Sequence, residues 1–186
     1  METRAGGPKI RIICSPGVPS LVTQKKIALL GAPGVGKTSL VRRFVESLFD
    51  DKYLTTIGVK VDKKSLRVGD DDVALMIWDI AGAEEHFSVP SSYVKGAAGY
   101  LLVADGTRPE TLDAGVRIVE QIDRDLGQIP FVLVLNKHDL VESWRGDLAG
   151  DPRLQSRSLA TLSSSAKTGE NVDEAFQRLA AAIVSR

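Results

Sequence analysis

The chain has 186 residues, and its 24 Lys and Arg residues balance its 24 Asp and Glu residues. A chain of this length typically forms one domain that buries its core without help from disulfides or metals. The neutral total argues against a nucleic-acid-binding surface or a polybasic membrane patch, and no apolar run is long enough to span a bilayer.

The single cysteine, Cys14, has no partner for an internal disulfide, so we expect a reducing compartment and a cytoplasmic location. The first residues lack the apolar core of a secretion signal. Residues 183–186 contain no cysteine for prenylation, so we expect no lipid anchor.

The chain divides into two parts by composition. Residues 1–24 hold three of the eight prolines and a Gly-Gly pair, which predicts a flexible N-terminal extension with at most a short edge strand near residues 10–13. Residues 25–186 form the main domain, in which strand-like and helix-like spacings alternate.

Apolar periodicity predicts the elements of the main domain. Short apolar runs predict strands at residues 26–30, 59–66, 73–78, 100–104 and 131–135. Helical spacing predicts helices at residues 37–48 and 112–126 and a last helix after Asn171, which we expect to form a capping box with Glu174.

Two connections carry turn signals. Residues 68–72 contain one glycine and three aspartates, which predicts a hairpin with a longer loop. Residues 141–158 are interrupted by Gly146, Gly150 and Pro152, so we expect a loose loop. The whole pattern predicts an α/β fold with an about six-stranded, mostly parallel sheet, one antiparallel edge strand and helices on both faces.

Residues 31–38, Gly-Ala-Pro-Gly-Val-Gly-Lys-Thr, match the pattern of a phosphate loop between a strand and a helix. Glycines let backbone N–H groups converge on a phosphate, and the helix adds its partial positive charge. Lys37 can reach the β- and γ-phosphates, and the Thr38 hydroxyl suits Mg²⁺. The expected phosphate contacts are Gly31, Gly34, Val35, Gly36, Lys37, Thr38 and Ser39.

Asp79 stands at the carboxyl end of an apolar strand, the edge where open α/β sheets bind ligands. A carboxylate there can hold Mg²⁺ through a water, although an isolated Asp at this place is more often a cap or turn residue. The N–H of Gly82 can approach a γ-phosphate and withdraw once that phosphate is lost.

The motif Asn136-Lys137-His138-Asp139 follows directly on the run 131–135. The Asp139 carboxylate can accept from N1–H and the 2-amino group of guanine, while the Asn136 amide serves the acceptor side and the Lys137 stem lies along the base. Adenine would set an acceptor against Asp139, which disfavours an ATPase or kinase. Alone, the motif is usually a turn, and we expect His138 to be solvated.

With these motifs the main domain, residues 25–186, resembles a small GTPase of the Ras superfamily, closest to the Rab branch, with the G-domain fold of P-loop NTPases. The resemblance implies GTP and GDP as ligands with Mg²⁺ held by Thr38, Thr56 and Asp79. It implies catalytic roles for Lys37, Thr56 and Gly82. It assigns further nucleotide contacts to Phe49, Tyr53, Ser165, Ala166 and Lys167, with core packing as the alternative for Phe49.

Ala83 departs from the family pattern, which has Gln at this place to orient the attacking water. A methyl group cannot orient water. Two readings remain: GTP hydrolysis is slow, or another group among Glu84, Glu85 and His86 substitutes. An exposed histidine in such a segment is more often a surface residue. A non-hydrolysing GTP-binding adaptor is the alternative to a slow switch.

Two further departures concern partners. Pro33 lies in the phosphate loop where relatives often have glycine, and its ring would crowd the route of an activator's arginine. Residues 59–61 lack the Phe that Rab proteins carry for effectors, although Trp78 is retained. We expect protein effectors and regulators at residues 50–60 and 82–95 and no nucleic-acid partner.

Overall fold

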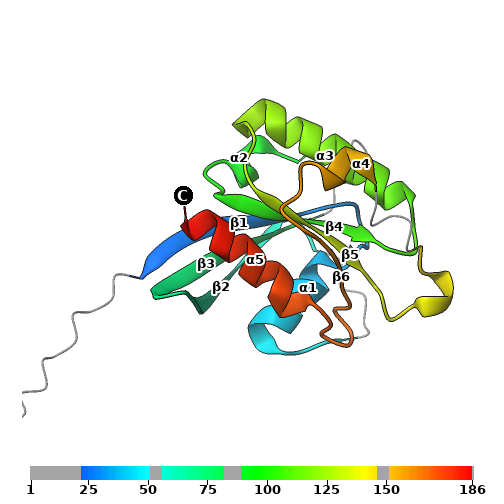
Figure 1. Cartoon of the computed structure of the whole chain (residues 1–186), viewed down its shortest axis with the longest axis horizontal. Coiled ribbons are helices and arrows are strands. Elements are labelled where there is room, and N and C mark those ends of the chain that lie inside the picture. Colours follow the sequence, from blue (N-terminus) through cyan, green and yellow to red (C-terminus); the bar gives the residue numbers. More distant parts are fainter. Residues whose placement is uncertain (1–21, 51–55, 82–88, 146–150, 186) are drawn as a thin grey trace, which may run out of the picture.

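The computed structural model of the chain is built around a six-stranded sheet in the order β2-β3-β1-β4-β5-β6 (Figure 1). Only the β2–β3 pair is antiparallel among the described strands, and β2 lies at the edge, as predicted. The strands are β1 (Thr23–Leu30), β2 (Val59–Val68), β3 (Asp71–Ile80), β4 (Gly99–Asp105), β5 (Phe131–Asn136) and β6 (Thr161–Ser163). The structure describes residues 22–50, 56–81, 89–145 and 151–185.

Helices cover both faces of the sheet, which confirms the predicted α/β class (Figure 1). Helices α1 and α5 lie on one face, and α2, α3 and α4 lie on the other. The helices are α1 (Lys37–Glu46), α2 (Ser91–Val94), α3 (Glu110–Leu126), α4 (Pro152–Gln155) and α5 (Val172–Val184), with a 3₁₀ turn η1 (Val141–Ser143).

Stacked aromatic pairs anchor the two halves of the core. On the α1–α5 face, the rings of Phe44 and Phe176 stack with centroids 3.9 Å apart. On the α3 face, Tyr100 and Phe131 stack at 5.0 Å. Every residue of β4 and β5 is buried, because parallel strands covered on both faces contact no water. These rigid strands fix the positions of the loops at their carboxyl ends.

The β2–β3 hairpin is tighter than predicted. Strand β3 begins at Asp71, so only Gly69 and Asp70 connect the strands, and Gly69 adopts a φ of 60°. The predicted loop at residues 68–72 is wrong because Asp71 and Asp72 pair in register with β2. Because these two aspartates are polar and lie at the end of the hairpin, the sequence pattern indicated a loop where the strand begins.

The predicted capping box at α5 is wrong. Asn171 has a left-handed φ of 53° and makes no side-chain cap bond. Its Nδ2 donates to the carbonyl of Ser163 at 2.7 Å, and Glu174 accepts from Arg178 Nε at 2.6 Å. The helix begins where predicted, but the Asn amide closes the preceding loop.

The connection after β5 is more ordered than predicted. The turn η1 and helix α4 lie within residues 141–158, and Leu154 is fully buried. Pro152 begins α4 because proline is favourable in the first turn, where Asp151 accepts from the Arg153 N–H at 2.9 Å. A loose loop is therefore wrong for the described part of this connection. Residues 146–150 lie outside the described residues.

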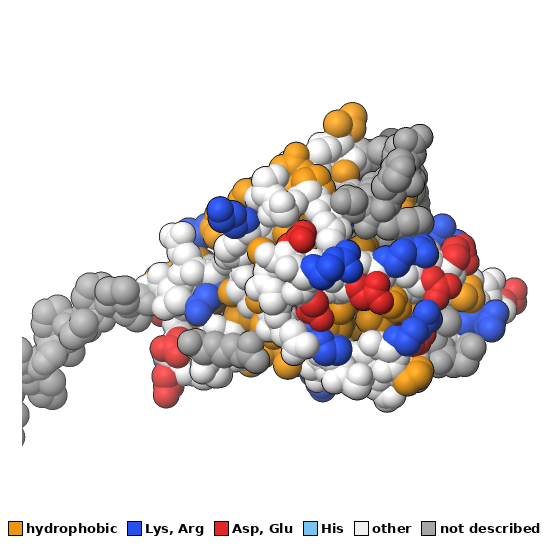
Figure 2. All heavy atoms as spheres, turned by 90° about the horizontal axis from the view of Figure 1, so that it is seen from above, with side chains coloured by type: hydrophobic (Ala, Val, Ile, Leu, Met, Phe, Trp, Pro, Cys, Tyr) orange, Lys and Arg blue, Asp and Glu red, His pale blue; other side chains and the backbone are white. Residues whose placement is uncertain are grey.

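The surface over α3 and α4 mixes both signs of charge (Figure 2). Arg157 pairs with Asp123 at 2.6 Å, and Arg153 pairs with Asp113 at 2.9 Å. In the part of the chain that the structure describes, no helix has the length and apolarity to cross a membrane. Of the predicted extension, only residues 22–24 are described, and Thr23 already belongs to β1.

Candidate nucleotide-binding site

The phosphate loop, residues 31–38, connects β1 to α1 in a conformation that requires glycine. Gly31, Gly34 and Gly36 have φ angles of 146°, 72° and 97°. A Cβ on Gly31 would lie 2.1 Å from the Val103 carbonyl oxygen, and one on Gly36 would lie 2.3 Å from Asn136 Nδ2. The loop is therefore pressed against β4 and β5 and has no room for side chains at these two positions.

Lys37 folds back over the phosphate loop. Its side chain is buried, and Nζ donates to the carbonyls of Gly31 at 2.9 Å and Ala32 at 3.0 Å. Burial lowers the pKa of Lys37 to about 8, while Asp79 opposes the shift. A buried ammonium is stabilised by an anion at close range, so this cation suits a phosphate group. Ser39 follows, half-buried, in the first turn of α1.

Three oxygen-bearing side chains meet beside the phosphate loop. Thr38 Oγ1 donates to Asp79 Oδ2 at 2.6 Å and lies 2.6 Å from Thr56 Oγ1. The Thr38 hydroxyl has one proton and gives it to Asp79, so Thr56 donates to Thr38. Residues from α1, β3 and the segment before β2 are thus brought together as the sequence pattern requires for a cation.

The donor set of this cluster fits Mg²⁺. Asp79 Oδ1 is buried without a hydrogen-bond partner among the described residues, and burial raises the pKa of Asp79. A hard cation with oxygen ligands would satisfy that orphaned atom. Among the described residues, no group of three or more His, Cys, Asp or Glu side chains is arranged to hold a metal ion. The cluster of Thr38, Thr56 and Asp79 offers one carboxylate and two hydroxyls.

Asn136 ties the phosphate loop to the segment after β6, which we call the C-terminal base loop (residues 164–171). The Asn136 side chain is buried, and its Nδ2 donates to the Val35 carbonyl at 2.9 Å. Its Oδ1 accepts from the Ala166 N–H at 3.1 Å. The family resemblance assigns Ala166 to the nucleotide, and its N–H would have to share this proton with a bound base.

The Asp139 carboxylate is oriented from the C-terminal base loop. Ser165 Oγ donates to Asp139 Oδ1 at 2.6 Å and itself accepts from the Thr168 N–H at 3.1 Å. Asp139 is half-buried and Ser165 fully buried, whereas Lys167 is exposed. Asn136 and Asp139, which the motif predicts at the base site, and Ser165, which the family resemblance assigns to the nucleotide, therefore lie together in the fold.

Asp105 is a buried carboxylate that sequence analysis missed. It ends β4 and is 1% exposed. It binds Lys137 Nζ at 2.7 Å, Arg108 Nε at 2.9 Å and the N–H and hydroxyl of Thr107. Burial alone would raise the pKa of Asp105, but these bonds outweigh it and lower the pKa. An Asp at the carboxyl end of a central strand was the signal that could have identified it.

The sequence analysis also did not predict the role of Arg43 of α1 in holding the C-terminal base loop. Its Nε donates to the Ala166 carbonyl at 2.9 Å, and its Nη2 donates to the Lys167 carbonyl. Arg43 therefore holds the carbonyls of the C-terminal base loop, while Asn136 holds the Ala166 N–H. A single arginine on a half-exposed helix face carries no sequence signal for such a contact.

The matching family model is described as the Ras family and covers residues 26–185. The chain is 40% identical over 164 residues to "Ras-related protein Rab-4A" of Mus musculus, across 87% of this chain and 75% of the relative. The Homo sapiens protein of that name has the same identity and coverage. The chain belongs to the Ras family. It is a Rab-like small GTPase of the Ras superfamily and a GTP-binding molecular switch.

Several predicted Ras-family positions lie outside the described residues. They are Tyr53, Gly82, Ala83, Glu84, Glu85 and His86. Phe49 is described and packs, partly buried, against the core beneath α1 and α5, so its contact with the base stays a prediction. His138, expected to be solvated, is partly so: its side chain is 32% exposed, while its Nδ1 lies 2.9 Å from Glu170 Oε2 and its ring contacts Trp144 edge-on.

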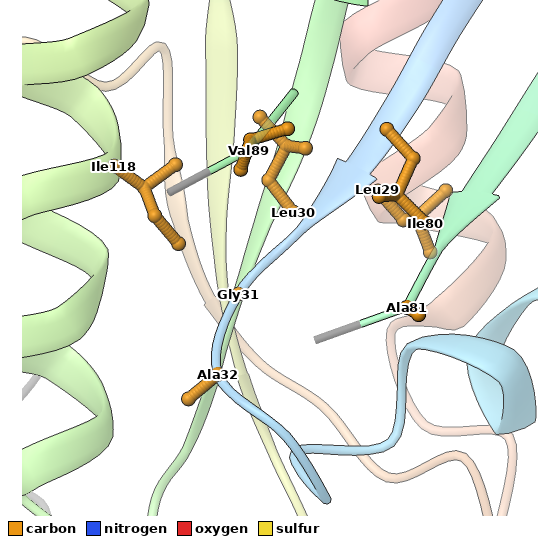
Figure 3. A pocket seen from close by; sticks show the side chains of 8 residues that line it. All are labelled: Leu29, Leu30, Gly31, Ala32, Ile80, Ala81, Val89 and Ile118. Atoms are coloured by element: carbon orange, nitrogen blue, oxygen red, sulfur yellow. The ribbon is translucent and has the colours of Figure 1, made fainter. Parts of the chain in front are cut away.

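An apolar pocket lies under the start of the phosphate loop, between the ends of β1 and β3 (Figure 3). Its described lining has no charged side chain, and Gly31 and Ala32 of the phosphate loop form part of it. Gln121 of α3 holds one wall: its Nε2 donates to the Val89 carbonyl at 2.7 Å and its Oε1 accepts from the Val89 N–H at 3.0 Å. The lining residues are Leu29, Leu30, Gly31, Ala32, Ile80, Ala81, Val89 and Ile118.

Replacing Asn136 with Ala removes both bonds that tie the phosphate loop to the C-terminal base loop. We expect GTP and GDP affinities to fall about 5- to 150-fold, because two buried bonds at roughly 0.5–1.5 kcal/mol each correspond to about 1–3 kcal/mol. Fluorescent-nucleotide titration measures this loss. Gln121→Ala is the matched control, since that amide also makes one donor and one acceptor bond to backbone. Equal affinities in the two variants would contradict this role for Asn136.

Proposed function

We propose that the chain is a guanine-nucleotide switch that binds GTP and GDP with Mg²⁺ and hydrolyses GTP slowly. The observation that carries the proposal is the alignment of three sites on one sheet edge: the phosphate loop, the Thr38–Asp79 cluster and the Asp139 carboxylate held by Ser165. A nucleoside triphosphate spans a phosphate site and a base site of this kind.

Guanine selectivity rests on the Asp139 carboxylate. Ser165 donates to one of its oxygens, which orients the group while leaving a carboxylate acceptor edge for the paired donors of guanine. Adenine would leave those acceptors unpaired, and such mismatches are rejected strongly. The stem of Lys137, whose ammonium pairs with Asp105 at 2.7 Å, would lie along the base.

The Mg²⁺ would be held by Thr38, Thr56 and Asp79 and would neutralise charge on the β- and γ-phosphates. The chain's own part is to present these oxygens and the Lys37 ammonium at one place. Thr56 precedes the edge strand β2, so loss of the γ-phosphate would release the segment leading into that strand.

Slow hydrolysis is inferred from Ala83, which replaces the water-orienting glutamine of the family. The same substitution supports a second candidate, a GTP-binding adaptor that does not hydrolyse its ligand. Release of phosphate at a measurable rate, alone or with a partner protein, would exclude the adaptor.

Protein partners are expected at residues 50–60 and 82–95. In the described part, Ile57 is 93% exposed and Val61 is 43% exposed next to the free edge of β2. Exposed apolar side chains on an edge strand and just before it suit a protein partner better than water. With a single cysteine, Cys14, we place this activity in the reducing cytoplasm.

Asp139→Asn tests the base assignment. Xanthine has a carbonyl where guanine has its 2-amino group, so the asparagine amide should favour xanthosine triphosphate over GTP. Competition titrations should show a preference reversed by at least about tenfold. Asp123→Asn, which removes a carboxylate paired with Arg157 on α3, should keep the GTP preference. An Asp139→Asn protein with undiminished GTP preference would remove the basis of the proposal.

Ala83→Gln tests the cause of slow hydrolysis. We expect single-turnover GTP hydrolysis to rise roughly 10- to 100-fold, because the amide can orient the attacking water. Ala83→Leu adds similar bulk without an amide and should leave the rate low. If the wild-type protein already hydrolyses GTP quickly and Gln changes nothing, the deficit has been wrongly assigned to this position.

A further inference from the structure

Arg108 lies at the rim of the phosphate loop, in the connection between β4 and α3. Its Nε donates to Asp105 Oδ2 at 2.9 Å, and its Nη2 donates to the Pro33 carbonyl at 3.3 Å. Pro33 is one of the residues of the phosphate loop itself. A guanidinium is therefore already positioned on the loop that surrounds the phosphates.

The contacts of Arg108 allow its guanidinium to exchange partners. Its side chain is 41% exposed, and the bond to the Pro33 carbonyl is long, so that contact is weak in water. Asp105 is buried but keeps Lys137 Nζ at 2.7 Å and two bonds from Thr107. Departure of Arg108 would leave that carboxylate paired with a cation.

Negative charge that develops on the γ-phosphate during hydrolysis is a group that Arg108 can stabilise. Hydrolysis spreads negative charge over the γ-phosphoryl oxygens and the bridging oxygen, and Ras-related enzymes commonly meet that charge with an arginine. Ala83 contributes no polar side-chain group, and the Pro33 ring would narrow the approach for an arginine from a partner protein. A cation supplied by the chain itself avoids that approach.

We propose that Arg108 acts in cis as a catalytic residue, moving from the Pro33 carbonyl to the γ-phosphate of GTP and stabilising the charge of hydrolysis. The inference rests on the proposed function. Water oxygen forms a bond to the γ-phosphorus as the bond from that phosphorus to the β–γ bridging oxygen breaks. The electron pair stays on the β-phosphate of GDP, and the proton of the water passes to the released phosphate.

A purely structural Arg108 would give a different result. If it only supported the phosphate loop, its removal would weaken GTP and GDP binding together with hydrolysis. A group that contacts the γ-phosphate in the transition state changes the rate of hydrolysis much more than the affinity for GDP. The two roles therefore separate in a comparison of rate and affinity.

The experiment compares wild type, Arg108→Ala and Arg108→Lys, with Arg153→Ala as control. Arg153 is an exposed arginine that pairs with Asp113 and Asp151, and neither partner belongs to the phosphate loop. Single-turnover GTP hydrolysis, GTP and GDP affinities, and formation of the complex of GDP with aluminium fluoride are measured for each protein.

We expect Arg108→Ala to lower the hydrolysis rate roughly 100-fold, to change GDP affinity less than about threefold and to abolish the aluminium fluoride complex. Arg108→Lys should recover part of the rate, and Arg153→Ala should match wild type. Unchanged hydrolysis in Arg108→Ala, an equal loss of rate and GDP affinity, or GTP binding by wild type with no hydrolysis would each overturn the inference. Absence of GTP binding by wild type would overturn the proposed function itself.

Discussion

The amide of Asn136 is the interaction on which the site depends. It joins residues that are 101 and 30 positions away in sequence, the Val35 carbonyl and the Ala166 N–H. Because this amide is buried, both its donor and its acceptor must be satisfied, which fixes the spacing between the phosphate loop and the C-terminal base loop. Glycine is required at position 36 for the same reason, since a Cβ there would clash with the Asn136 amide.

Charged side chains of both signs lie at the same edge of the sheet as the Asn136 amide. The buried carboxylates Asp79 and Asp105 face the cations Lys37, Lys137 and Arg108 at the carboxyl edge of the sheet. The neutral total of the chain thus conceals a local site in which cations are held by buried acids and available to an anionic ligand.

The sequence was sufficient to predict the fold class and a mostly parallel sheet with one antiparallel edge strand. It also predicted that Asn136, Asp139 and the phosphate loop lie at the carboxyl ends of strands. These follow from periodicity and from motifs whose spacing is set by local chemistry. The roles of Arg43 and Asp105 could not be predicted, because each depends on contacts across the sheet between distant segments. The predictions of the hairpin loop and of the Asn171 cap were wrong because polar residues also occur in paired strands and in hydrogen bonds that close loops.

The central claim is that Asp139 recognises guanine while the loop ending at Thr38 holds its phosphates. Titration of the purified chain with GTP, GDP and ATP, with and without Mg²⁺, tests it most directly. The account predicts that both guanine nucleotides bind at least roughly 1,000-fold tighter than ATP, with Mg²⁺ strengthening GTP binding. ATP binding as tight as that of GTP, or no binding of either nucleotide, would contradict it.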